Sequence, residues 1–415
     1  MTHLNMQNKV QRFVDALVPW LFSLLFAFPC LPLQIANSLF IVFAFFVLIS
    51  FSFKTVTSIR QKITRNLLIA LPFIPYLIEL LLHSGNHIVA FEFQKKLLFF
   101  TAPIVVGMYL SMYPLKPLKT YMYIFTASLL ALTIYSLTIL VWQHILFSPE
   151  SYENGAYILR NSFEKISHLH PTYYSLFASV SILWIISEYS NKSNLIKFLL
   201  IASGLILFFQ ELFVAAKMPL TALAISSLFL IYRITPNRKK LLGIYALLIL
   251  CIIILPFVVP SLKNRVYEVR TFVGPPQNYP NTVNDRRVIF DCGISTFLHN
   301  IWVGVGAGNS QIILNQCYAE KDFKKANTVP YNAHNQFLTL GINYGIVPLL
   351  LLIVTLAIYF KRTFSNPFAT ALMISCILVM FTESILERQW GVYFYVLFFL
   401  LIMNTPQGTA AVKDI

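Results

Sequence analysis

The sequence predicts an all-α membrane protein that crosses the bilayer about twelve times and carries a large loop before its last three spans. Of the 415 residues, 57% are hydrophobic and only 11% are charged, and the mean hydropathy is +0.70. Soluble proteins carry about 25% charged residues, so this apolar surplus needs lipid as its solvent. Apolar runs close to the length that spans a bilayer, about 20 residues, also recur throughout the chain.

The expected spans divide the chain into three parts. Nine spans fall in a transmembrane part at residues 1–260, a large loop occupies 261–333, and the part at 334–415 holds three more spans and a short cytoplasmic tail. The spans are Phe13–Leu31, Ala36–Phe53, Asn66–Leu82, Leu97–Tyr113, Tyr121–Phe147, Thr172–Ser187, Leu195–Leu212, Met218–Tyr232, Leu241–Pro260, Asn335–Phe360, Phe368–Ile385 and Trp390–Met403.

The loop at 261–333 differs from the rest of the chain because it is polar and contains the glycine run GVGAGN at 304–309. Helical periodicity predicts a helix over Asp285–His299 and a shorter one over about Asn309–Phe323. One face of the first helix would be apolar, formed by Phe290, Ile294 and Phe297. The loop is therefore expected to be partly helical.

The basic residues orient the chain. With an N-terminus in the cytoplasm, seventeen Lys and Arg residues fall on the cytoplasmic side and six in the short outer loops. This asymmetry predicts that both termini are cytoplasmic and that the large loop lies outside. The net charge of +15 then reflects contacts of the inner-face runs at 54–65 and 233–240 with anionic membrane lipids, and no nucleic-acid partner is expected.

Two of the five cysteines, Cys292 and Cys317, fall in the outer loop, where disulfides can form. Spacing alone leaves open whether they pair. Cys30, Cys251 and Cys376 fall in or near spans and are expected to be packing residues. The cysteines and histidines have no zinc-binding spacing, so no metal site is predicted.

The stretch AHNQFLTLGINYGI begins at Ala333, where the loop returns to the membrane. This position puts the imidazole of His334 at the outer interface, in reach of lipid head groups and water. From the residues alone, His334 is either a polar residue at the start of a helix or a group that takes part in chemistry.

HNQFLTLGINYGI, after a long outer loop and before an apolar span, resembles the HN-x-x-L signature of the O-antigen ligase and O-antigen polymerase superfamily. These are integral-membrane glycosyltransferases that use polyprenyl-diphosphate-linked glycans. Arg286, eighteen residues before Gly304, is similar to the family's arginine, helix and G-x-G-x-G turn. The family often has Trp four residues after the arginine, where this chain has Phe290.

Two weaker elements also resemble the family, and together the likeness covers about residues 160–348. AAKMPLTALAI places Lys217 where many members carry an arginine at the start of a span. HPTYYSLF, from His170, looks like the start of a mid-chain span in relatives. The twelve-span plan also fits the family.

The resemblance implies roles for the outer basic residues, and elementary chemistry agrees with them. Arg and Lys bind diphosphate oxygens and stabilise the charge of the leaving group, while a neutral histidine can take the proton of an acceptor hydroxyl. His334 is therefore the expected catalytic residue. Arg286, Lys217, Arg160 and Arg287 are the expected diphosphate ligands, and Asn335, His170, Gly304 and Gly306 are supporting residues.

Each of these residues also has a structural interpretation. Arg286 could pair with Asp285 or Asp291, Lys217 could be an interfacial lysine, and Arg160 could pair with Glu164. Arg287 faces another direction on the helix, and His170 could simply begin a helix before its proline. The glycine run lacks the βαβ context of a dinucleotide site, and a turn that approaches the membrane or a phosphate is expected there.

The leading hypothesis is an O-antigen ligase of the bacterial inner membrane, with its active site facing the periplasm. It would move a glycan from undecaprenyl diphosphate to a lipid A-core sugar by an inverting reaction that needs no metal or cofactor. The nearest alternative is a polymerase that joins repeat units on the same carrier. A transporter of glycolipid or polysaccharide is the alternative from another class, although Glu79 is the one clear mid-span acid.

Overall fold

The computed structural model describes residues 2–54, 56, 58–83, 85–145, 155–214, 216–258, 282–327 and 330–405. Within these ranges every regular element is a helix, which confirms the all-α class. The end of the expected span Leu241–Pro260, the first part of the loop at 261–281 and the tail at 406–415 lie outside the described residues.

The described elements of the first half are α-helices and 3-10 turns. They are α1 (Thr2–Leu24) with the 3-10 turn η1 (Leu25–Cys30), α2 (Leu33–Phe53), α3 (Ile59–Asn66), η2 (Leu67–Ile69), η3 (Leu71–Phe73), α4 (Ile74–Leu82), α5 (His87–Met112), α6 (Leu118–Trp142), α8 (Gly155–Ser167), α9 (Pro171–Glu188) and η4 (Tyr189–Asn191).

The second half continues the series and includes the helices of the loop. Its elements are α10 (Asn194–Val214), α11 (Lys217–Ile234), α12 (Arg238–Val258), α14 (Thr282–His299), α15 (Ala307–Glu320), η6 (Lys324–Asn327), α16 (Gln336–Tyr344), α17 (Ile346–Thr363), α18 (Pro367–Met380), η7 (Ile385–Glu387) and α19 (Gln389–Asn404).

Seven helices in the described part of the chain are long and apolar enough to cross a membrane, or up to nine if two bent helix pairs each count as one span. Shorter apolar helices, α18 and α19, end the series. Large apolar side chains point outward from these helices, for example Ile41 and Leu205, which are 66% and 62% exposed. Such surfaces fit a lipid environment, and the count of twelve spans stays a prediction.

Two expected spans are broken in the structure and are not continuous helices. The segment Asn66–Leu82 is divided by the turns η2 and η3, and the helices on either side of the break are bent by 57°. The segment Asn335–Phe360 divides at Gly345, whose φ of +79° ends α16 and begins α17. A Cβ atom there would meet the carbonyl oxygen of Trp302 at 2.4 Å, so the close approach of the loop requires glycine.

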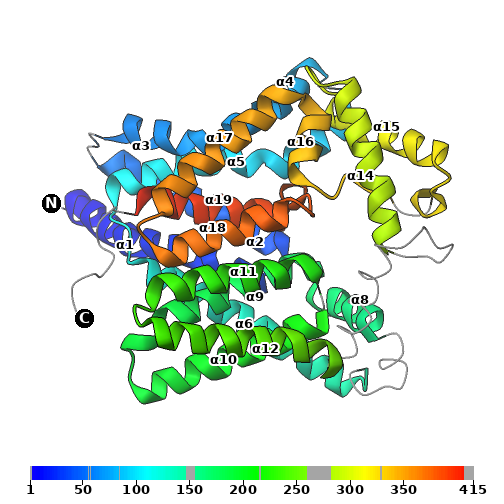
Figure 1. The fold of residues 1–415 in the computed structure, drawn as a ribbon. Helices are drawn as coiled ribbons and strands as arrows, with labels where there is room; N and C mark the ends of the chain where they lie inside the picture. The colour runs from blue at the N-terminus through cyan, green and yellow to red at the C-terminus, as the bar shows by residue number, and fades with distance from the viewer. Residues whose placement is uncertain are drawn as a thin grey trace.

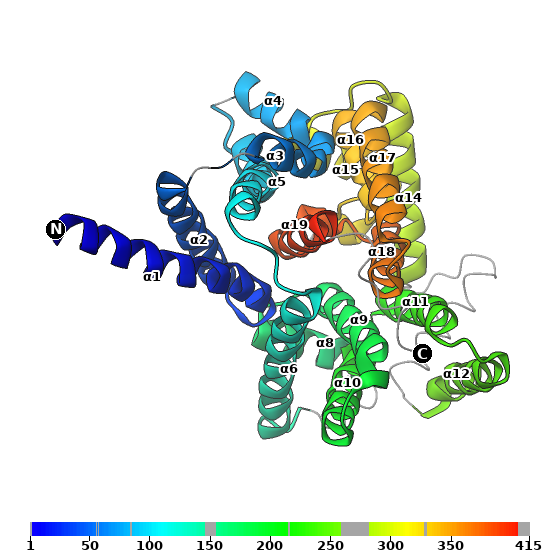
Figure 2. The same cartoon turned by 90° about the vertical axis from the view of Figure 1, so that its left-hand side faces the viewer.

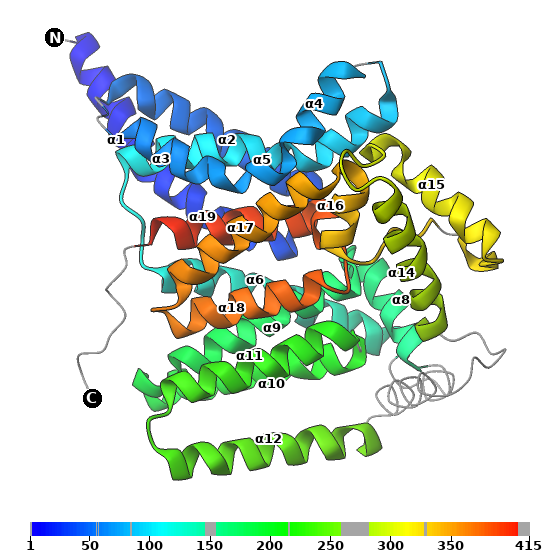
Figure 3. The ribbon, with the colours of Figure 1, turned by 45° about the horizontal axis from the view of Figure 1, so that its top comes forward.

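The long helices run in broadly one direction, and the ends of the bundle differ (Figure 1). The N-terminus lies at one end, while α8, α14 and α15 gather at the other, where α14 runs across the direction of the long helices (Figures 1 and 3). Viewed along the bundle, α19 lies among α5, α9, α16 and α18 (Figure 2), and nearly all of its side chains are buried. The loop helices thus cover one end of a closely packed bundle.

Two hydrophobic cores meet at α16. The large core fills the bundle and is rich in aromatic residues, and a smaller core lies among the loop helices. Leu340 and Tyr344 of α16 belong to the first core, while Leu338 and Ile342 belong to the second. Because one short helix buries side chains in both, α16 fixes the loop relative to the bundle.

The two loop helices lie close to their expected positions, but two residues of the expected apolar face of the first helix point away from the core. Phe290 and Ile294 are exposed, whereas Ile289 and Cys292 are buried. The buried face is chosen by the partner helix α15, to which Cys292 is joined by a disulfide with Cys317. The pairing that spacing left open is therefore formed in the structure.

Candidate functional site

A chain of three charged or polar side chains lies at the end of the bundle that carries the loop. The Nδ1 atom of His334, just before α16, is 3.1 Å from Oε2 of Glu383, which follows α18. Arg286 of α14 donates from its guanidinium to the other carboxylate oxygen over 3.3 Å. Three separate segments of the chain thus meet at one carboxylate.

The surroundings of Glu383 decide which ring nitrogen of His334 donates to it. Burial alone raises the pKa of Glu383, but the hydrogen bond and charge of His334, and then the charge of Arg286, outweigh it and lower the pKa below its ordinary value. The carboxylate is therefore ionised at neutral pH and accepts a hydrogen bond, which requires Nδ1 of His334 to carry the proton. In the neutral imidazole the lone pair is then on Nε2.

The backbone holds His334 in an unusual conformation. Its φ is +44°, in the left-handed region that non-glycine residues seldom occupy. The next residue, Asn335, caps α16 by accepting a hydrogen bond from the amide of Leu338 over 2.9 Å, and its side-chain amide donates to the carbonyl of Phe381. Strained residues persist where the surroundings hold them in place, often at functional sites, and the cap of Asn335 does so here.

His170 and two more arginines border this chain. The imidazole Nδ1 of His170 accepts a weak hydrogen bond from the amide of Thr172 over 3.4 Å at the start of α9. Burial, and then the charges of Arg388 and Arg160, lower the pKa of His170 to about 3. His170 is therefore neutral, and it lies within electrostatic reach of both His334 and Glu383.

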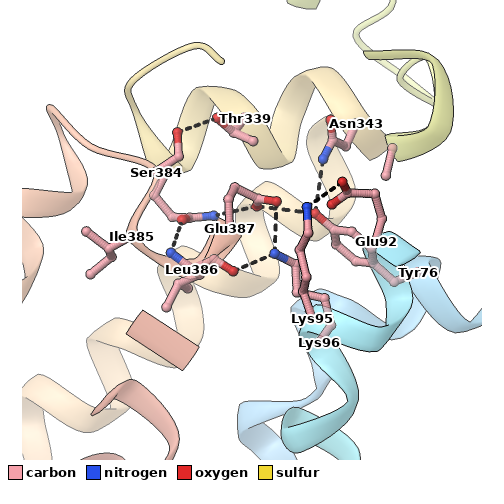
Figure 4. Close-up of polar contacts among 12 residues, drawn as sticks. Tyr76, Glu92, Lys95, Lys96, Thr339, Asn343, Ser384, Ile385, Leu386 and Glu387 are labelled. Carbon is pink, nitrogen blue, oxygen red and sulfur yellow. Dashed lines mark hydrogen bonds and ion pairs between the residues drawn. The ribbon is translucent and has the colours of Figure 1, made fainter. Parts of the chain in front are cut away.

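A second, buried polar network fixes the turn that follows Glu383 (Figure 4). The ammonium group of Lys96, which is fully buried, lies 2.8 Å from the carboxylate of Glu387. Gln336 accepts a hydrogen bond from the amide of Leu386 over 2.7 Å, and the hydroxyl of Tyr76 donates to Glu387 over 3.3 Å. The positions of Glu383 and Arg388 on either side of this turn are thereby set.

The glycine run contacts protein rather than open space. The amide of Gly306 donates to the carbonyl of Asn343 in α16 over 2.9 Å, and Gly304 lies so close to α16 that a Cβ atom would meet the amide nitrogen of Tyr344 at 2.4 Å. The amides of Ala307 and Gly308, at the N-terminus of α15, donate to the carboxylate of Glu79 over 3.1 and 3.2 Å. A helix N-terminus attracts anions, and here an internal carboxylate takes that place.

Of the expected site residues, the structure brings His334, Arg286, His170 and Arg160 into one neighbourhood. Asn335 supports His334, as described above. Lys217 begins α11, which packs beside α9 and α18. The catalytic and ligand roles of these residues stay predictions.

Arg287 and the glycines take other positions. Arg287 is exposed on a different face of α14 from Arg286, as the sequence indicated. Gly304 and Gly306 position α16, and the anion that approaches the turn is the side chain of Glu79.

Sequence reasoning missed Glu383 as the partner of His334, and it did not single out Arg388, whose charge acts on His170. Glu383 is 49 residues from His334, so no local pattern joins them. Glu383 itself is marked in the sequence as an acid at the outer end of an apolar span, since such residues are costly to bury and are often functional.

Among the described residues, no group of three or more His, Cys, Asp or Glu side chains could hold a metal ion. The expectation of a reaction without a metal stays a prediction.

Residues 198–353 match the sequence profile of the family described as O-Antigen ligase. No curated protein matches the chain. The matched segment runs from α10 into α17 and contains His334, Arg286 and Lys217, whereas Glu383 and His170 lie outside it. This match supports membership in the O-antigen ligase superfamily, as the HN-x-x-L signature indicated.

Proposed function

We propose that the protein is an O-antigen ligase that transfers a glycan from undecaprenyl diphosphate to a lipid A-core sugar at the periplasmic face of the inner membrane. The observation that carries this proposal is the hydrogen-bonded chain from Arg286 through Glu383 to His334. It joins a cation that suits a diphosphate to a histidine whose Nδ1 is held by a carboxylate, within one site.

In the proposed reaction the acceptor hydroxyl attacks the anomeric carbon of the lipid-linked glycan. Nε2 of His334 takes the hydroxyl proton as the new carbon–oxygen bond forms, and the bond from the anomeric carbon to the diphosphate breaks. The attack from the face opposite the leaving group inverts the configuration. Glu383 orients the imidazole and stabilises its positive charge after the proton has moved, as the carboxylate partner of a catalytic histidine does.

The leaving undecaprenyl diphosphate gains negative charge as the glycosyl bond breaks. Arg286 is 45% exposed at its side chain, so its guanidinium is accessible to a lipid head group as well as to Glu383. Arg160 and Arg388, which both act on His170, bring further positive charge to the same neighbourhood. We assign Arg286 and Lys217 to the diphosphate, with Arg160 as a further ligand.

The disulfide supports a periplasmic location for the loop. Cys292 and Cys317 are bonded, and structural disulfides persist in oxidising compartments such as the periplasm and seldom in the cytoplasm. This agrees with the excess of basic residues in the loops at the other end, which favours cytoplasmic termini.

Transfer from a defined undecaprenyl-diphosphate glycan by the purified protein tests the proposal. With lipid A-core supplied as the acceptor, the ligase is expected to produce core-linked glycan and release undecaprenyl diphosphate. In cells that lack the protein, polymerised glycan should remain on the lipid carrier while the core carries none. Absence of transfer under conditions in which the protein is folded would reject the proposal.

The related polymerase is the second candidate, because it would use the same donor and the same histidine. If cells that lack the protein carry single repeat units on the core, the protein is the polymerase and not the ligase. A transporter would instead move glycolipid across vesicle membranes without forming a glycosidic bond, and it would do so even with His334 replaced by alanine.

A further inference from the structure

The exposed surface of α14 is divided lengthwise into an apolar half and a polar half. Residues four apart lie on one face of a helix. Starting at Arg286, one line of exposed side chains spaced four residues apart runs along the helix and consists of Phe290, Ile294 and Leu298. The neighbouring exposed line is Arg287, Asp291, Ser295 and His299. The remaining face packs against α15 and α16.

The apolar line is exposed along the whole helix, most strongly at its end, and continues into the turn that follows it. Phe290 and Leu298 are 41% and 60% exposed, and Trp302 and Val303 in the turn are 77% and 79% exposed. We call Phe290, Ile294, Leu298, Trp302 and Val303 the apolar stripe. Water would oppose such a continuous apolar surface, since soluble surfaces keep large apolar side chains apart.

The apolar stripe is continuous with the outward surface of a membrane-crossing helix. The amide of Ile346, at the start of α17, donates to the carbonyl of Ile301 over 2.7 Å, and the backbone of Trp302 lies against Gly345. Just beyond this junction, Val347 and Leu350 of α17 are 59% and 51% exposed. Because α17 is one of the helices that can cross the bilayer, the stripe extends its lipid-facing surface.

The direction of α14 agrees with this reading. The helix runs across the long helices rather than along them (Figures 1 and 3), so it lies roughly in the plane of the membrane surface. A helix in that plane, with one apolar and one polar exposed face, suits the boundary between head groups and acyl chains.

We propose that α14 lies in the outer interface of the bilayer, with the apolar stripe among the lipid acyl chains and the line from Arg287 to His299 facing water. This arrangement holds Arg286, at the end of the same line as the stripe, at the depth of the lipid phosphates. The consequence for Arg286 rests on the proposed function, because a lipid diphosphate would then meet the guanidinium without leaving the membrane. The lipid contact itself does not rest on it.

Spin labels on neighbouring faces of α14 test the proposal. Single cysteines replace Ile294, Leu298 or Ser295 in the full chain, with Cys30, Cys251 and Cys376 changed to serine and the disulfide kept. The labelled proteins are placed in nanodiscs of phosphatidylethanolamine and phosphatidylglycerol. We then measure how often each label collides with oxygen and with a water-soluble nickel chelate. Oxygen concentrates in the acyl chains, whereas the chelate stays in water.

The ratio of oxygen to nickel collisions is expected to be several-fold higher for I294C and L298C than for S295C. Ser295 is the matched control, since it is exposed on the same helix but lies on the polar line. Equal ratios at the three positions would overturn the proposal. Labels at Ile294 and Leu298 that are shielded from both reagents would also overturn it, because a protein surface would then cover the stripe.

A charge in the stripe separates this inference from the proposed function. Leu298→Asp is expected to raise the KM for the lipid-linked donor several-fold, whereas Ser295→Asp leaves it unchanged, and thiol counting shows that both variants keep the disulfide. An unchanged KM in L298D would contradict the depth assigned to Arg286. If no variant and no wild-type protein transfers glycan while the labels still report lipid, the proposed function fails and the lipid contact stands.

Discussion

Two glutamates four residues apart, Glu383 and Glu387, lie on either side of the same turn and meet opposite surroundings. Glu383 contacts Arg286 and His334, whose side chains are 45% and 29% exposed. Glu387 contacts Lys96, which is fully buried. One glutamate thus belongs to an accessible cluster of side chains, and the other belongs to a buried polar network.

This difference in exposure indicates which charged side chains can contact a substrate. A partly exposed ion pair can exchange partners at little cost, because such pairs contribute little to stability. A buried pair cannot open without leaving an uncompensated charge. Changes at the Glu383 cluster should therefore alter transfer, and changes at the Glu387 network should alter folding. Four predictions test this division, in order of decreasing expected effect.

His334→Ala is expected to lower the rate of glycan transfer about 10³-fold, because it removes the group that takes the acceptor proton. Transfer by the purified variant measures this loss. His299→Ala is the matched control, since His299 is an exposed histidine at the end of α14 that bonds only its own helix, at the carbonyl of Ser295, among the described contacts. A rate near that of the wild type in H334A would refute the catalytic assignment.

Lys96→Met is expected to destabilise the fold by about 3–5 kcal/mol, since it leaves the carboxylate of Glu387 buried without its cation. Reversible unfolding in mixed micelles measures this change. The double variant K96M/E387Q removes both charges and should regain much of the lost stability. If the free energy of unfolding of the double variant is clearly lower than that of K96M, the two residues do not act as a pair.

Arg286→Ala is expected to lower transfer about tenfold to a hundredfold, because one donor to the leaving diphosphate is lost from a partly exposed position. Steady-state transfer at several donor concentrations measures the effect. Arg287→Ala is the matched control on the next position of α14, and it should change the rate little. Equal losses in the two variants would point to a general effect of positive charge rather than a directed contact.

Glu383→Gln is expected to lower transfer about tenfold, because glutamine cannot stabilise a charged imidazole as a carboxylate does. The pH dependence of stability gives a second readout. The pKa of Glu383 lies below its ordinary value of 4.5 in the folded protein. The stability that the carboxylate contributes is therefore fully present above about pH 4.5 and is lost as the pH falls through the lowered pKa.

Unfolding of the wild type and of E383Q across this pH range checks the sign. The difference between them should be constant above pH 4.5 and shrink at lower pH. A difference that grows as the pH falls would show that the carboxyl group is protonated in the folded protein. The hydrogen bond to His334 would then need another explanation.

The sequence by itself determined the class of protein, the late polar loop and the positions of His334 and Arg286. Hydrophobic runs, charge asymmetry and short signatures are local properties, so they can be read without knowing which segments touch. For the same reason, the helices expected over Asp285–His299 and about Asn309–Phe323 lie close to α14 (Thr282–His299) and α15 (Ala307–Glu320).

Tertiary structure alone decided the contacts between distant segments. It paired Cys292 with Cys317 and placed Glu383 beside His334. It also placed the carboxylate of Glu79 against the amides at the N-terminus of α15. It also broke the expected span at Gly345, because Trp302 of the loop comes too close for any side chain. Packing energies depend on which surfaces meet, and a linear pattern of residues does not contain that information.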